Sequence, residues 1–169
     1  MVGPPFPVLC KRAAKLIRGG SLHEDSDVSQ VEKNSYEWIA RINDLGFLTC
    51  SSQDGQIDER AFVHGFMTLV RARELTHRLN CSSDKIFIVL QPSPRMESII
   101  PLTKVHLKGC TNIHLYDDMI PSDRQEAGID PSTRCVKVIA IDAVWSRKAY
   151  GKRGLWHDLV LALEAIDHP

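Results

Sequence analysis

The sequence predicts an α+β fold, which we expect to be a single domain with a mixed, mostly antiparallel sheet and about three helices, preceded by an N-terminal arm. Helical and strand patterns mix along the chain without a strict strand-helix-strand alternation. The length of 169 residues suits one domain with an ordinary buried core. The longest apolar runs, such as residues 86–90, are about five residues long, so we expect no transmembrane segment.

The N-terminal arm and an acidic connector occupy residues 1–28, and we assign the α+β domain to residues 29–169. Three prolines within residues 1–7 argue against a helix there, because each removes a donor and fixes φ. Residues 9–18 predict a short amphipathic helix that Gly19 and Gly20 would stop. A helix of this length is marginal alone and needs a surface to pack on.

The first half of the domain begins with the helix that has the strongest sequence signals, at residues 29–45. Ser29 and Glu32 have capping-box spacing, and Gly46 stands where a helix C′ residue belongs. Residues 47–50 predict a strand, residues 51–56 a turn in which Asp54 and Gly55 are able to adopt positive φ, and residues 60–66 a second strand.

The second half predicts a helix over residues 68–79, ended by Asn80, and then a central strand over 85–90. Short strands follow at 105–107 and 113–116, and residues 117–133 suit a surface loop. Residues 136–144 predict the last strand, in which Asp142 is the acid expected to be partly buried. Residues 155–166 form the expected closing helix.

The overall composition is balanced, with 21 basic and 21 acidic residues, and argues against a DNA-coating protein. The five cysteines are odd in number and widely spaced, which favours free thiols in an intracellular, reducing compartment. No apolar signal-peptide core follows the N-terminus.

This balance hides an asymmetry. Residues 1–22 carry four cations and no acid, so the remainder carries 17 cations against 21 acids. The arm therefore either folds onto its own domain or a neighbouring subunit, or presents a basic stretch to an acidic partner, anionic lipid as a peripheral membrane contact, or nucleic acid. A transit peptide is a further alternative. The candidate partner-binding residues are Lys11, Arg12, Lys15 and Arg18.

A second basic segment, residues 145–157, interleaves four cations with three aromatic residues before a helix N-terminus. Cations, stacking rings and free helix amides suit a phosphate group or a single-stranded nucleic acid. The alternative is a solvated basic loop with Trp145 and Trp156 in the core, and no phosphate-binding glycine motif is present. The candidate anion-binding residues are Arg147, Lys148, Lys152 and Arg153.

His106 and His114 are the candidate metal ligands. A hairpin centred on Cys110 would place them opposite each other, with Cβ atoms about 5 Å apart. The alternative is a solvent-facing pair, because no third ligand is evident beyond the candidates Asp117 and Asp118. Cys110 and His114 do not match a zinc pattern either, since a second pair of ligands is missing.

Catalytic motifs are weak. No nucleophile motif surrounds Ser51 or Ser52, and no pattern links Cys50 to His64. We therefore expect no catalytic residue and no cofactor. A small hydrolytic or metal-dependent enzyme built around His64, His106 or His114 remains the third hypothesis.

Two stretches, GFLTCSSQDG at 46–55 and ERAFVHGF at 59–66, resemble a group of uncharacterised small proteins of large double-stranded DNA viruses, phages and some bacteria. The Ser83–Lys85 turn and the stretch from Asp142 to Arg147 are also similar. The resemblance covers roughly residues 36–165, leaves the basic arm outside, and implies a shared fold rather than a reaction. No functional residues follow from it.

These observations favour a non-enzymatic structural or interaction protein, as a minor component (a minor capsid protein) of a large virus particle, whose basic arm contacts a neighbouring subunit. The alternative is a nucleic-acid or phosphate-binding module that uses residues 145–157.

Overall fold

A computed structural model describes residues 3–19, 30–82, 85–91 and 124–168 and confirms the α+β fold. Its sheet contains β1 (Leu48–Gln53), β2 (Phe62–Thr68), β3 (Ile86–Gln91) and β4 (Cys135–Asp142). The strand order is β1-β2-β4-β3, and each neighbouring pair is antiparallel.

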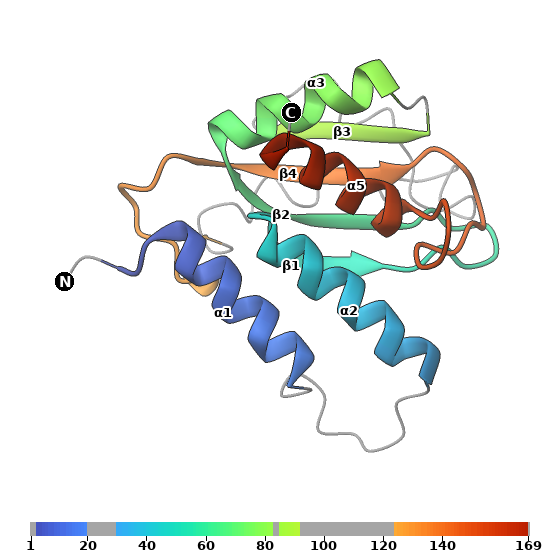
Figure 1. The fold of residues 1–169 in the computed structure, drawn as a ribbon, viewed down its shortest axis with the longest axis horizontal. Coiled ribbons are helices and arrows are strands. Elements are labelled where there is room, and N and C mark those ends of the chain that lie inside the picture. The colour runs from blue at the N-terminus through green and yellow to red at the C-terminus, as the bar shows by residue number, and fades with distance from the viewer. Residues whose placement is uncertain (1–2, 20–29, 83–84, 92–123, 169) are drawn as a thin grey trace, which may run out of the picture.

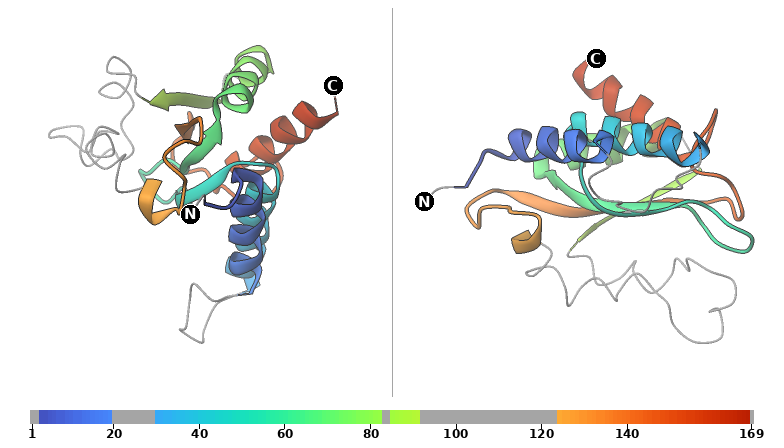
Figure 2. Two further views of the ribbon diagram at one scale, coloured as in Figure 1. Left: turned by 90° about the vertical axis from the view of Figure 1, so that its left-hand side faces the viewer. Right: turned by 90° about the horizontal axis from the view of Figure 1, so that it is seen from below.

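Four long helices lie on one side of this sheet (Figures 1 and 2). α3 and α5 lie over the sheet, while α1 and α2 lie side by side near the β1 edge. Their bounds are Phe6–Arg18 for α1, Gln30–Asp44 for α2, Leu69–Ser82 for α3 and Leu155–Asp167 for α5. A further single helical turn occupies residues 124–126. Among the described residues, α2, α3 and α5 are the three long helices expected in the domain, and α1 is the helix expected in the arm.

The main core lies between the sheet and the helices. Period-two alternation places Val63, Val138 and Ala140 on the helix-facing side, and the apolar stripe of each helix covers them. Fully buried side chains of α2, α3 and α5 complete this core, among them Ile42, Ala72, Leu75, Leu155, Leu159 and Leu163.

A second, smaller core cluster joins α1 to the β1 end of the sheet. Phe6, Leu9 and Cys10 of α1 pack with Leu48, Phe66 and Ile129. The backbone amide of Gly3 also donates to Asp130 Oδ2 at 3.1 Å. The helix of the arm therefore packs on its own domain.

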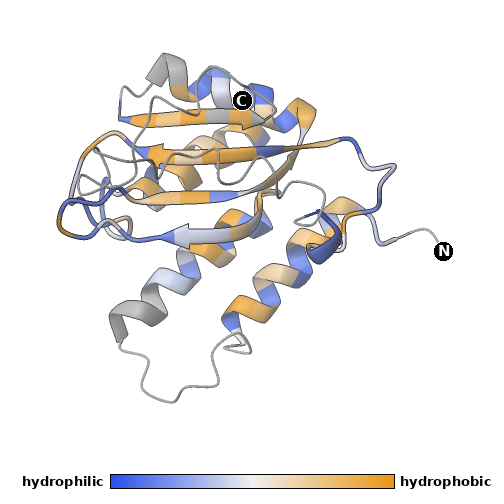
Figure 3. Ribbon diagram, turned by 180° about the vertical axis from the view of Figure 1, so that it is seen from behind, coloured by the Kyte–Doolittle hydropathy of each residue, from blue (hydrophilic) through white to orange (hydrophobic). Residues whose placement is uncertain are grey.

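The β1 strand differs from the rest of the sheet in hydropathy. Figure 3, which shows the face opposite the helices, gives β2, β3 and β4 as largely hydrophobic and β1 as more polar. The register of β1 against β2 shifts between Thr49 and Ser51, which leaves Cys50 as the extra residue of a β-bulge.

Several expected boundaries were wrong. α1 begins at Phe6 rather than after the prolines, because Pro5 is its N-cap and proline is tolerated in a first helical turn. β1 continues to Gln53 through residues expected as a turn, since its pairing with β2 carries them. α3 continues past Asn80 to Ser82. β3 lies at an edge of the described sheet rather than in its centre.

Two glycine expectations had different outcomes. Gly46 follows α2 with φ +85°, as the C′ prediction requires. In the β1–β2 loop, however, the residue with positive φ is Asp58 rather than Asp54 or Gly55. Gly55 is required there because another loop lies too close for a side chain. A Cβ atom on Gly55 would lie 2.0 Å from the carbonyl oxygen of Arg147. The β1–β2 loop and the segment before α5 are therefore in direct backbone contact.

Candidate functional site

The four cations of α1 divide into two groups. Arg18 pairs through Nη2 with Glu37 Oε1 and through Nη1 with Asp44 Oδ2, each at 2.8 Å, and so ties α1 to α2. The hydrogen bonds from Arg18 lower the pKa of Glu37. Arg18 is thus ion-paired within the chain, whereas the sequence predicted that it binds a partner.

Lys11, Arg12 and Lys15 stay exposed on the outer side of α1, and no carboxylate in the described part of the chain forms an ion pair with them. Val8 is 50% exposed beside them and Leu16 is 44% exposed. We call this set, Val8, Lys11, Arg12, Lys15 and Leu16, the basic face of α1. A face with both cations and exposed apolar groups is suited to a partner.

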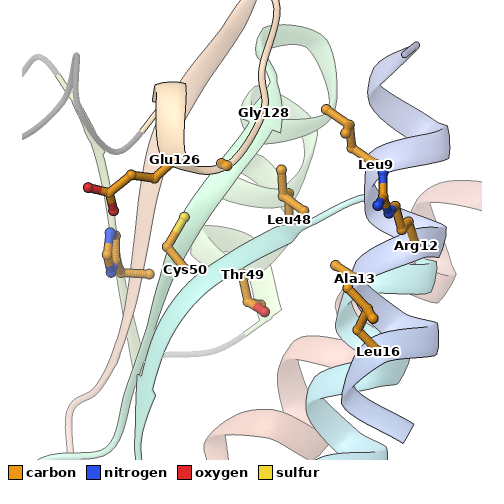
Figure 4. Close-up of a pocket in the computed structure, with 11 residues that line it drawn as sticks. Leu9, Arg12, Ala13, Leu16, Leu48, Thr49, Cys50, Glu126 and Gly128 are labelled. Atoms are coloured by element: carbon orange, nitrogen blue, oxygen red, sulfur yellow. The ribbon is translucent and has the colours of Figure 1, made fainter. Parts of the chain in front are cut away.

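A cavity of about 540 Å³ lies between α1, β1 and the turn after residue 125. Figure 4 shows Arg12 and Glu126 at opposite sides of it, with Leu48, Thr49 and Cys50 of β1 between them. Its apolar wall comes from α1, through Leu9, Ala13 and Leu16.

A second cavity, of about 360 Å³, continues along β1 and shares Thr49 and Cys50 with the first. Ser51 and Ser52 of β1 line it, and α1 and α2 contribute Ile17, Tyr36 and Ile39. Together the two cavities form what we call the β1 groove.

The β1 groove brings together Cys50 and His64, which the sequence did not connect. The bulge at Cys50 and the pairing of Ser51 with His64 across the β1–β2 ladder place them in one cavity. His64 is 4% exposed and Cys50 is exposed. No group of three metal-ligating side chains occurs among the described residues.

The other described cysteines are less accessible to reagents. Burial raises the pKa of Cys10 to about 12, and burial also raises the pKa of Cys135. Cys50 is therefore the best-placed nucleophile among the described thiols.

The basic segment 145–157 holds two of its four cations in ion pairs. Arg147 Nε bonds to Asp142, whose carboxylate is fully buried, where the sequence predicted partial burial. The same carboxylate also accepts from the amide of Val144 at 2.8 Å. Lys148 Nζ bonds to Asp54 Oδ2 at 2.8 Å, which raises the pKa of Lys148. Lys152 and Arg153 are exposed just before α5.

The aromatic residues of this segment also contact other parts of the chain. The guanidinium of Arg60 lies 4.1 Å from the ring centroid of Trp145 and 5.5 Å from that of Phe87. Desolvation lowers the pKa of Arg60. Trp156 is buried in the core, as the alternative interpretation of this segment expected.

The predicted metal ligands His106 and His114 lie outside the described residues. No helix in the described part of the chain is both long and apolar enough to cross a bilayer.

Comparison with known proteins gives no relative. No family model matches the sequence, and no curated protein or solved structure matches it significantly.

Proposed function

We propose that this is a non-enzymatic interaction protein whose basic face of α1 contacts an acidic surface of a neighbouring protein subunit. The observation that carries the proposal is the division of α1 into two sides. Its apolar side is buried in the second core cluster, and its opposite side presents Lys11, Arg12 and Lys15 without a described counter-charge. Such a fixed basic surface favours encounter with an acidic partner.

The resemblance of residues 46–66 to proteins of large double-stranded DNA viruses supports a particular setting, a minor component of a large virus particle. In that setting the neighbouring subunit belongs to the particle.

Charge reversal tests the proposal better than deletion. Removing residues 1–22 would also expose Leu48 and Phe66, so loss of binding would not distinguish misfolding from a lost contact. The double variant Lys11→Glu/Lys15→Glu changes only exposed side chains. Its matched control is Lys152→Glu/Arg153→Glu, which makes the same change of charge at another exposed site.

The tagged protein is purified from the cells that produce it naturally, and its complexes are measured by native mass spectrometry. We expect the wild type and the control to retain the same partner subunit. The Lys11→Glu/Lys15→Glu variant should retain roughly tenfold less of it, because two attractive contacts become repulsive. Equal retention by both variants would contradict the proposal.

The same pair of variants tests the alternative, a phosphate or nucleic-acid module. Loss of oligonucleotide binding in Lys152→Glu/Arg153→Glu alone, with a steep dependence on salt, would favour it. The ion pairs of Arg147 with Asp142 and of Lys148 with Asp54 weigh against it, since each cation already has a carboxylate partner.

A further inference from the structure

The starting observation is that β1 lies at an edge of the sheet. Among the described strands it is paired with β2 alone. The amide of Thr49 points away from β2 but already donates to Asn43 Oδ1 at 3.0 Å, so an added strand would pair with the backbone beyond Thr49. An edge strand presents backbone donors and acceptors that can pair with a further strand.

The β1 groove runs along that edge. α1 walls it on the helix side, and the turn after residue 125 lies across from α1 (Figure 4). The four residues of β1 beyond Thr49, residues 50–53, offer about 13 Å of strand at roughly 3.3 Å per residue. The two cavities, of about 540 and 360 Å³, together give room for several extended residues.

The chemistry of the groove is suited to alternating side chains. Its floor is polar, with Thr49, Cys50, Ser51 and Ser52, and its walls are largely apolar, with Leu9, Ala13 and Ile17. Arg12 lines the groove on one side, and Lys11 and Lys15 lie on the same helix. Only Glu126 among the described lining residues is acidic.

We propose that the β1 groove binds an extended acidic segment of a partner protein, which adds a strand to β1. Backbone hydrogen bonds to β1 supply affinity. Alternate side chains select the segment, the apolar ones against α1 and the acidic ones toward Arg12. The inference rests on the proposed function, because it names the part of the partner that the basic face of α1 recognises.

A second copy of this chain fits the groove less well. Pairing of two β1 strands would bring together two basic faces, each with Lys11, Arg12 and Lys15, and like charges across an interface oppose association. An acidic extended segment has the opposite charge.

The probe is an acetylated and amidated six-residue peptide of alternating valine and glutamate. It is titrated to millimolar concentration, on the order of 1 mM, into the full-length isotope-labelled protein, and amide shifts and amide exchange are measured by nuclear magnetic resonance. We expect shifts centred on β1 and a roughly tenfold slowing of exchange for its outward amides. The same peptide with alternate backbone amides methylated should lose this protection, because it cannot complete the ladder.

A variant pair keeps the test specific. Ala13→Phe places a ring in the groove and should weaken binding roughly tenfold, whereas Val70→Phe makes a similar enlargement at a 75% exposed position of α3 outside the groove and should not. If Ala13→Phe does not fold, the methylated peptide still decides the question on the wild type.

Each result separates the inference from the proposed function. Protection of β1 that methylation abolishes supports strand addition. Binding that shifts α1 alone and is lost in Lys11→Glu/Lys15→Glu overturns strand addition but leaves the basic face as an interaction surface. No binding of the peptide, or protection of β1 by self-association without peptide, overturns the inference. Loss of the natural partner in Lys11→Glu/Lys15→Glu tests the proposed function independently of the peptide.

Discussion

Arg147 and Asp142 show how a single pairing changes the interpretation of a basic segment. The sequence places Arg147 among four cations near a helix N-terminus, which suggests a ligand. The structure instead pairs it with the carboxylate five residues earlier, which is fully buried at the end of β4. The burial of Asp142 was predictable from the strand pattern, but its partner was not, because the turn between them determines which cation reaches it.

The pair gives a stability prediction. Arg147→Ala leaves the Asp142 carboxylate buried without its cation, and we expect the free energy of unfolding to fall by about 2–3 kcal/mol. Arg153→Ala removes an exposed cation of the same segment and should change it by less than about 0.5 kcal/mol. Urea unfolding followed by fluorescence measures both changes. Equal losses in the free energy of unfolding would show that the buried ion pair stabilises the fold no more than an exposed cation does.

The cysteines give a reactivity prediction. With iodoacetamide at pH 8, we expect Cys50 to be alkylated well before Cys10 and Cys135, because Cys50 is exposed and the other two have a raised pKa. Peptide mapping by mass spectrometry after timed quenching measures the order. Addition of urea should bring Cys10 to the rate of Cys50, and early alkylation of Cys10 in the folded protein would contradict its burial.

At the scale of elements, two loops at one end of the sheet form a single unit. Asp54 accepts from Lys148 Nζ and from the amide of Ala149, and Ser146 Oγ accepts from the amide of Asp58. Gly55 lies directly against the backbone of Arg147. These contacts fix the β1–β2 loop to the segment before α5.

Gly55→Ala tests this arrangement. Its Cβ would lie 2.0 Å from a backbone oxygen, so the loops must separate, and we expect a loss of about 1–3 kcal/mol in the free energy of unfolding. Gly3→Ala is the control, since its Cβ would meet Asp130 Cβ at an ordinary 3.4 Å and should cost little. Thermal unfolding of the two variants side by side gives the comparison.

The sequence predicted whether each element is a helix or a strand better than it predicted which elements lie next to each other. The apolar spacing of α2, α3 and α5 and the continuous apolar runs of β3 and β4 are local signals, and these five elements lie within a few residues of their predicted positions. The strands predicted at 105–107 and 113–116 lie outside the described residues. The order of the strands is not local. β3 has the apolar run of a central strand, yet it lies at an edge of the described sheet.

The candidate site was harder to predict for the same reason. Cys50 and His64 meet through a bulge and a cross-strand register, and neither leaves a motif in the sequence. The β1 groove depends on how α1 lies beside an edge strand. By contrast, the four cations of the first 22 residues were visible in the sequence, and they all lie on α1. All four are exposed, and Arg18 also pairs with Glu37 and Asp44.

Across the whole molecule, arginine side chains join the four helices in series. Arg18 joins α1 to α2, Arg41 joins α2 to α5, and Arg71 joins α3 to α5. Their carboxylate partners are Glu37 and Asp44, then Glu164, then Asp167. Because these pairs are partly exposed, each contributes modestly, and their main effect is to fix how the helices lie on the sheet.

The series predicts an acid sensitivity. Hydrogen bonds from Arg18 and Arg71 lower the pKa of Glu37 and Asp167 from their ordinary values of 4.5 and 3.8. A lowered folded-state pKa stabilises the fold above the ordinary value, and this contribution is lost as pH falls through the folded-state pKa. The melting temperature should therefore decline below about pH 4.5.

The double variant Arg18→Gln/Arg71→Gln isolates this contribution. It should be less stable than wild type by about 1 kcal/mol at pH 7 and should lose less on acidification, since its carboxylates no longer have lowered pKa values. Thermal melts between pH 7 and pH 3 make the comparison. Parallel curves for the two proteins would show that other groups govern acid unfolding.

The place of β4 has a consequence for how the protein is made. β4 is the last strand in the chain, yet it lies between β2 and β3 and pairs with both. While the chain is being synthesised, β2 and β3 are complete before the strand that joins them exists, so each keeps an unpaired, hydrophobic side. The sheet is thus completed only when its middle strand, β4, pairs with β2 and β3. The nascent protein stays open to edge-to-edge association until residue 142 has left the ribosome.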